Sequence, residues 1–60
     1  MQVAERCEAK NCRLYYDVLQ ELYFVVQKNK DGSILHTKET QLFQSVELSK
    51  VDEFINQLTN

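Results

Sequence analysis

A single glycine, Gly32, is the feature that most constrains the fold of this 60-residue chain, which contains no proline. Glycine adopts positive φ angles at no steric cost, so the only glycine of a chain is expected where the backbone must reverse. Asn29, Lys30 and Asp31 precede it, and strand-forming residues flank this segment on both sides. The segment therefore predicts a β-hairpin.

The register of this hairpin depends on which pairing brings apolar side chains together, because a slip of one residue turns every side chain to the opposite face. A two-residue turn at Asp31 and Gly32 would place Phe24 and Val25 opposite charged residues. A four-residue loop over 29–32 is therefore favoured. It pairs Lys28 with Ser33, Val26 with Leu35 and Phe24 with Thr37.

Apolar residues recur at helical spacing over residues 2–21, and this stretch contains no helix breaker. The spacing predicts an amphipathic helix over about 2–21. From Tyr23 the chain becomes aromatic and β-branched, which favours a strand over about 22–28. The alternative is a helix that continues through Val26, because short apolar runs fit both periods.

Three further elements follow from the same patterns. The hairpin implies a strand over about 33–38, and alternating apolar residues predict a third strand over about 41–48. Ser49, with Asp52 three residues later, predicts the start of a helix over about 50–58. The chain is thus expected to form one small α+β domain over 1–60, of order α-β-β-β-α, with a three-stranded antiparallel sheet and both helices packed on one face.

One face of this predicted sheet is unusually apolar for a surface in contact with water. If the helices cover the face of Phe24 and Val26, the other face carries Tyr23, Val25, Gln27, Ile34, His36, Phe43 and Ser45. Large apolar residues on a second face indicate a protein interface, although strand propensity alone would also scatter such residues on a surface. The predicted interface residues are Tyr23, Val25, Ile34, His36 and Phe43, with Tyr16 as an exposed aromatic on the first helix.

The sequence carries no sign of catalysis, of a cofactor or of a metal site. His36 is the sole histidine, and no glycine-rich loop or pair of carboxylates accompanies it. Structural zinc needs four ligands, whereas Cys7, Cys12 and His36 supply three soft ones. On one helix the two cysteines would lie about 140° apart, which disfavours a disulfide and predicts free thiols. Fraying of the first turns would permit a disulfide or an intermolecular contact through Cys12.

The net charge of −2 disfavours non-specific attraction to a polyanion. Lys28, Lys30 and Lys38 on the hairpin still allow an alternative, a dimer that binds nucleic acid. No stretch approaches the roughly 20 apolar residues of a membrane span, and no export signal opens the chain, so a cytoplasmic protein is expected.

A small core also favours oligomerisation. Together these features predict a small non-enzymatic protein-interaction module, a homodimeric regulator or inhibitor like many small phage proteins.

Overall fold

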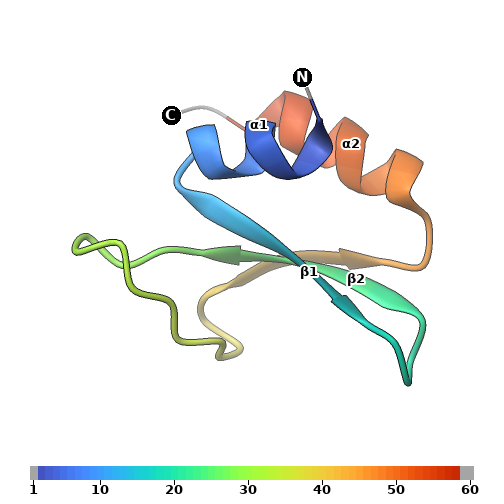
Figure 1. Cartoon of the computed structure of the whole chain (residues 1–60), viewed down its shortest axis with the longest axis horizontal. Helices are drawn as coiled ribbons and strands as arrows, with labels where there is room; N and C mark the ends of the chain where they lie inside the picture. Colours follow the sequence, from blue (N-terminus) through green and yellow to red (C-terminus); the bar gives the residue numbers. More distant parts are fainter. Residues whose placement is uncertain (1, 59–60) are drawn as a thin grey trace.

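The computed structural model describes residues 2–58 of the chain. Its elements are α1 (Val3–Ala9), β1 (Cys12–Asp17), β2 (Leu22–Gln27), β3 (Gln41–Ser45) and α2 (Leu48–Gln57). The three strands form an open antiparallel sheet in the order β1-β2-β3, so β2 lies in the centre. The predicted α-β-β-β-α order is confirmed, and both helices lie on one face of the sheet (Figure 1).

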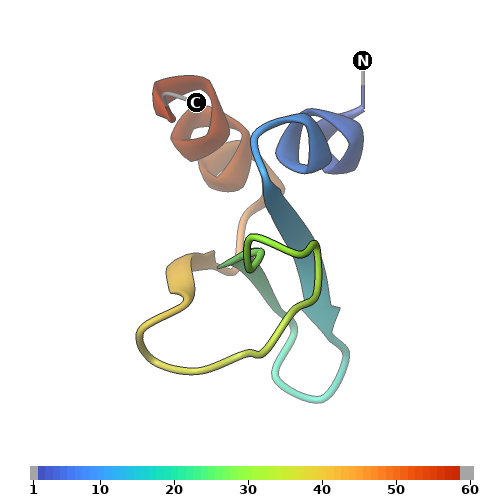
Figure 2. The same cartoon turned by 90° about the vertical axis from the view of Figure 1, so that its left-hand side faces the viewer.

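The two helices lie side by side and contact each other as well as the sheet (Figure 2). In the register of the sheet, Leu14 pairs with Val25, and Val25 pairs with Phe43. Directly paired residues point to the same face of a sheet, so these three side chains form a row across all strands. This row lies under the helices and forms the floor of the core.

The core is small and involves every layer of the fold. Cys7, Cys12, Val25, Val51 and Ile55 are fully buried and form one cluster. Around it, the ring of Phe54 on α2 stacks on that of Phe43 with 4.6 Å between centroids. Val51, Phe54, Ile55 and Leu58 have the spacing that predicted an amphipathic second helix, and all four pack into or against the cluster.

The predicted first helix over 2–21 is wrong beyond Ala9. Asn11 adopts a left-handed φ of 62°, which asparagine tolerates better than most residues, and the chain then turns back as β1. Leu14 and Val18 are four residues apart, a spacing that suits one face of a helix but also one face of a strand. Pairing with β2 selects the strand, because the two tyrosines of β1 then pair with Phe24 and Tyr23 of β2.

The predicted strand over 33–38 is also wrong. Gly32 does close a turn with a φ of 87°, and its N–H donates to the carbonyl of Asn29 at 3.0 Å. The predicted pairings of Val26 with Leu35 and of Phe24 with Thr37 do not form, because β1 and β3 already occupy both edges of β2. Residues 28–40 therefore form a long loop between β2 and β3 (Figure 1).

The last two predicted elements exist with different ends. The third strand stops at Ser45 rather than near residue 48, and the Oγ atom of Ser45 accepts the N–H of Glu47 at 3.1 Å. The second helix begins at Leu48 with Glu47 as its N-cap, so Ser49 lies inside the first turn. The predicted Ser49 cap is therefore wrong by two residues.

The predicted assignment of sheet faces is inverted. Tyr23, Val25 and Phe43, expected on the uncovered face, lie under the helices. Phe24 lies on the opposite face, where its ring contacts that of His36 with 5.3 Å between centroids. Once β1 pairs with β2, the helices cover the face that joins Leu14 and Val25 across the two strands.

A substitution on α2 and a control at an exposed position test this core. We expect Ile55→Val to lower the free energy of unfolding by about 0.5–1.5 kcal/mol, because it removes a buried methyl group. Val46→Ala, at a side chain that is 68% exposed, should change it by less than about 0.5 kcal/mol. Urea denaturation followed by circular dichroism measures both values, and an equal loss in the two variants would contradict the described core.

Candidate functional site

The large apolar residues that are exposed outnumber the hydrophobic residues that are buried in the core. Among the described residues, six hydrophobic residues are fully buried, whereas eight large ones are exposed. The exposed ones are Tyr15, Tyr16, Val18, Leu19, Leu35, Leu42, Val46 and Leu48. Single exposed apolar residues are normal on protein surfaces, so their distribution matters more than their number.

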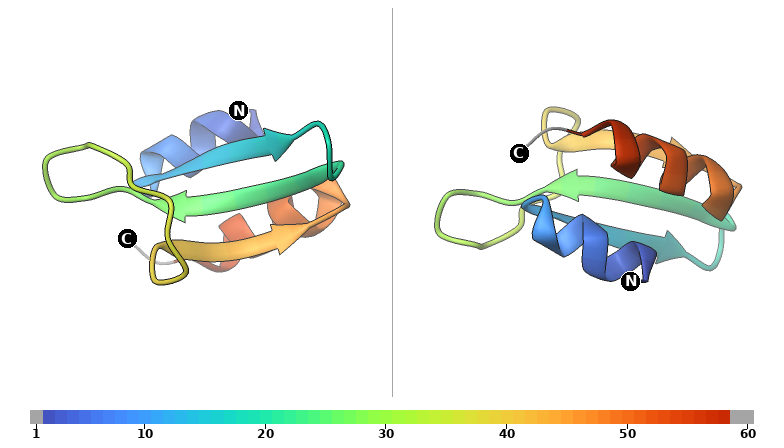
Figure 3. Two further views of the ribbon diagram at one scale, coloured as in Figure 1. Left: turned by 90° about the horizontal axis from the view of Figure 1, so that it is seen from below. Right: turned by 90° about the horizontal axis from the view of Figure 1, so that it is seen from above.

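Five of these eight residues gather at one end of the sheet. At this end β1 finishes, β2 begins and β3 finishes, and the chain then enters α2 (Figure 3). We name this surface the apolar end; it consists of Tyr16, Val18, Leu19, Val46 and Leu48. Val18 is 75% exposed and Leu19 is 96% exposed, so the turn between β1 and β2 presents both side chains to solvent.

The turn that carries Val18 and Leu19 is held by Asp17. One carboxylate oxygen of Asp17 accepts the backbone N–H groups of Leu19 and Gln20 at 2.9 and 3.1 Å, and the other accepts the side-chain amide of Gln20 at 3.0 Å. Glu21 then adopts a φ of 52° and leads into β2. Polar residues suffice to close such a turn, so the two apolar side chains at its tip have no role in its closure.

Tyr16 joins the apolar end to the helix-covered face. Its ring packs on that of Tyr23 with 4.7 Å between centroids, while 48% of the residue remains exposed. The sequence predicted an exposed aromatic at this position on a helix. Tyr16 lies instead on β1, and its exposure is confirmed.

The other predicted interface residues do not form one surface. Val25 is fully buried and cannot contact a partner, and Tyr23 and Phe43 are only partly exposed because they pack against the core. Ile34 and His36 lie on the 28–40 loop, and the Nε2 atom of His36 lies 2.7 Å from the side-chain oxygen of Gln41. The structure therefore separates the residues that the hairpin prediction brought together.

The sequence interpretation missed most of the apolar end. Val18 lay within the segment predicted as the first helix, and Val46 and Leu48 lay within the segment predicted as the third strand. The pair Val18–Leu19 between Asp17 and Gln20 is a usable signal only after this segment is recognised as a turn. Nothing in the local sequence indicated that the end of β3 would lie at the same end of the sheet.

The face of the sheet opposite the helices is a second candidate surface (Figure 3). Tyr15 and Leu42 are 38% and 36% exposed there, and Phe24 is half-buried beside His36. Val26 on the same face is fully buried. This open face is therefore less exposed than the apolar end.

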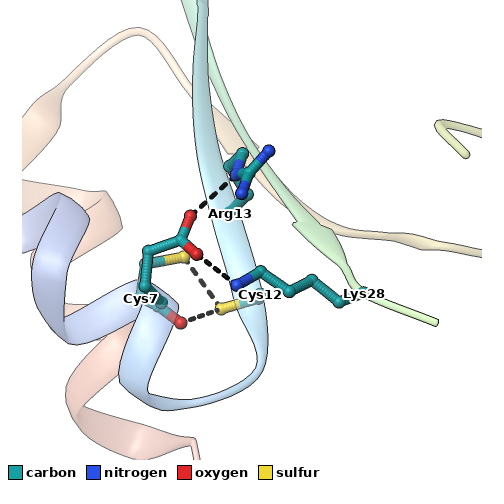
Figure 4. A network of polar contacts seen from close by, with 5 residues as sticks. Cys7, Cys12, Arg13 and Lys28 are labelled. Carbon is teal, nitrogen blue, oxygen red and sulfur yellow. Dashed lines mark hydrogen bonds and ion pairs between the residues drawn. The ribbon is translucent and has the colours of Figure 1, made fainter. Parts of the chain in front are cut away.

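The three predicted nucleic-acid lysines do not act alike. Lys28 forms an ion pair with Glu8, and only 16% of its side chain is exposed. The Nε atom of Arg13 donates to the same carboxylate at 2.8 Å, so one acidic group joins α1, β1 and the start of the loop (Figure 4). Lys30 and Lys38 remain exposed on the 28–40 loop.

The described residues offer little for small-molecule or metal chemistry. No group of three or more His, Cys, Asp or Glu residues within 2–58 could hold a metal ion. An open hollow of about 230 Å³ lies between α2 and β3, lined by Phe43, Lys50, Glu53, Phe54 and Gln57. Ligand sites usually enclose about 300 Å³ or more. No helix in the described part of the chain is long and apolar enough to cross a membrane.

Glu8, Arg13 and Lys28 form what we name the Glu8 cluster. This cluster predicts a dependence of the free energy of unfolding on pH. Hydrogen bonds from Arg13 and Lys28 lower the pKa of Glu8 in the folded chain. Its stabilising contribution is therefore present above the ordinary glutamate pKa and is lost as the pH decreases through the lowered value. We expect Glu8→Gln to be less stable than wild type near neutral pH, with a difference that shrinks between about pH 5 and pH 3.

Urea denaturation at several pH values measures this difference. Glu5→Gln is the matched control, because Glu5 lies exposed on the same helix and makes no ion pair among the described residues. A constant difference between wild type and Glu8→Gln at every pH would contradict the assigned role of the Glu8 carboxylate.

Comparisons with protein-family models, with curated proteins and with solved structures found no match for this chain.

Proposed function

We propose that this chain is a protein-interaction module that binds another protein by burying its apolar end. The exposure of Val18 and Leu19 at an ordered turn is the observation that carries the proposal. The module works by occupying a surface of its partner, as a regulator or inhibitor does, and we assign it no catalytic step. We place it in the cytosol.

The size of the apolar end is sufficient for an anchor. Burial of a leucine or valine side chain contributes about 1.5–3 kcal/mol, and Val18, Leu19 and Val46 are each more than half exposed in the free chain. Association costs at least about 4 kcal/mol in lost translational and rotational freedom. Binding therefore needs several of these side chains to enter a complementary apolar groove together.

The charges next to the apolar end indicate what kind of partner fits. Asp17 and Glu47 adjoin its apolar residues in the chain, and Glu21 follows Leu19 by two positions. Facing carboxylates would repel each other in a symmetric dimer formed through this surface. A different protein with an apolar groove and a basic rim fits better. The predicted homodimer is the competing arrangement, and it would use the apolar end or the open face.

Leucine substitutions distinguish a specific binding surface from non-specific hydrophobic association. We expect Leu19→Ser to abolish retention of a partner from a lysate of the native host, because it removes the most exposed apolar anchor. Leu35→Ser is the matched control, since Leu35 is 65% exposed on the 28–40 loop, outside the apolar end. Equal loss of partner retention in both variants would contradict the proposal, and so would full retention in both.

Sedimentation equilibrium of the same variants tests self-association. The proposal predicts a monomer at micromolar concentration for wild type and for both variants. A wild-type dimer that Leu19→Ser dissociates would assign the apolar end to a homodimer instead.

A second candidate function is the binding of single-stranded nucleic acid on the open face. Tyr15, Phe24 and His36 present aromatic rings there, and bases stack on such rings in sheet-based RNA-binding proteins. Lys30 and Lys38 would supply the cations. If this function is correct, an oligonucleotide is retained at low salt, and Lys30→Gln with Lys38→Gln reduces the affinity and the salt dependence. The primary proposal predicts no retention in a filter-binding assay.

A further inference from the structure

The fold brings its two cysteines into direct contact. Cys7 lies on α1 and Cys12 opens β1, and the left-handed backbone of Asn11 turns the chain between them. The two Sγ atoms lie 2.8 Å apart, and the thiol of Cys12 donates to the carbonyl oxygen of Cys7 at 3.0 Å (Figure 4). Both residues are fully buried and both thiols are free. A continuous helix would have held them apart, so only the break after α1 creates this pair.

We propose that Cys7 and Cys12 are a reactive dithiol that forms a reversible intrachain disulfide by exchange with a low-molecular-weight disulfide such as oxidised glutathione. The sulfur atoms already lie on the same side of the α1–β1 junction. Their separation of 2.8 Å exceeds the length of an S–S bond by about 0.8 Å. No third ligand adjoins the pair among the described residues, which favours this redox chemistry over metal binding.

The reaction takes place in two exchange steps. The thiolate of one cysteine attacks a sulfur of oxidised glutathione, forms a mixed disulfide and releases one glutathione thiolate. The thiolate of the other cysteine then attacks the protein sulfur of this mixed disulfide and releases the second glutathione. The two protons lost by the protein thiols are taken up by the two glutathione thiolates. The protein dithiol is oxidised by two electrons, and one glutathione disulfide is reduced to two thiols.

The closed structure protects the pair, so exchange requires α1 to move away from the sheet. Burial and the contact with Cys12 raise the pKa of the Cys7 thiol, which makes the thiolate scarce while the pair is covered. Polar contacts hold α1 in place. They are the Arg6–Asp52 ion pair, the Glu8 cluster with Arg13 and Lys28, and the Lys10 ammonium, which donates to the carbonyls of Ile55 and Leu58 at 2.6 and 2.9 Å.

The ease of this opening follows from the size of α1. The helix has seven residues and contributes one fully buried residue, Cys7, to the core. Short elements with few buried side chains open locally at lower cost than the whole domain. Once formed, the disulfide would join α1 to β1 covalently at the centre of the core and would act as the staple that a domain of this size otherwise lacks.

Equilibration of the full chain with oxidised and reduced glutathione tests the proposal. Under excess oxidised glutathione we expect a monomer that has lost the mass of two hydrogen atoms and takes up no alkylating reagent. Its melting temperature should rise by roughly 10 °C, and dithiothreitol should reverse both changes. Chains that are first unfolded in urea and then refolded in the same buffer should reach the same end state. This comparison distinguishes slow access to the buried thiols from absence of the reaction.

Single substitutions identify the second exchange step. Cys7→Ser and Cys12→Ser should each stop at a mixed disulfide with glutathione in the refolding experiment. If either variant does not fold, the wild-type mass and alkylation results still decide the matter. Two free thiols, a stable mixed disulfide or a disulfide-linked dimer of the wild-type chain after refolding would overturn the proposal.

The rate of thiol alkylation tests the role of the Glu8 cluster. Glu8→Gln should speed alkylation of the folded, reduced chain by roughly twofold to fivefold, because it weakens the contacts that close α1 over the thiols. Glu5→Gln, on the same helix, should leave the rate unchanged. An equal rate in wild type and Glu8→Gln would remove this cluster from the opening step.

Discussion

The pairing of β1 with β2 is the interaction on which the rest of this structure depends. It joins Leu14 to Val25 and Tyr16 to Tyr23, and so decides which face of the sheet the helices cover. It also leaves β2 only one free edge, which β3 takes, so the segment after Gly32 must leave the sheet as a loop. The turn that links the two strands then presents Val18 and Leu19 at the end of the molecule.

The break between α1 and β1 has chemical consequences as well as structural ones. It places Cys7 against Cys12 in the core and brings Glu8 between Arg13 and Lys28. The acidic group pairs with Lys28, one of the three lysines predicted to contact nucleic acid, and it holds α1 over the two thiols. One local change of direction therefore connects the charge distribution, the small core and the proposed reactivity of the cysteines.

Much of the fold was predictable where local patterns agree with tertiary contacts. The residues of β2 were recognised from their composition, the turn at Gly32 from its backbone requirement, and α2 from the spacing of Val51 and Ile55. The first helix was overextended because residues 14 and 18 fit both periods. The faces were inverted as a result, since a wrong partner for β2 reassigns every side chain of the sheet. Of the predicted interface, Tyr16 alone belongs to the apolar end.

The sequence by itself determined the segments that become β2 and β3, the amphipathic second helix and the position of the turn at Gly32. These properties depend on composition, short-range spacing and the φ angle of one glycine. Only the tertiary structure decided that residues 12–17 form a strand, which face is covered, where the apolar end lies and that the two thiols touch. Each of these depends on pairing between segments, and segments with similar local preferences compete for the same partner strand until long-range packing selects one of them.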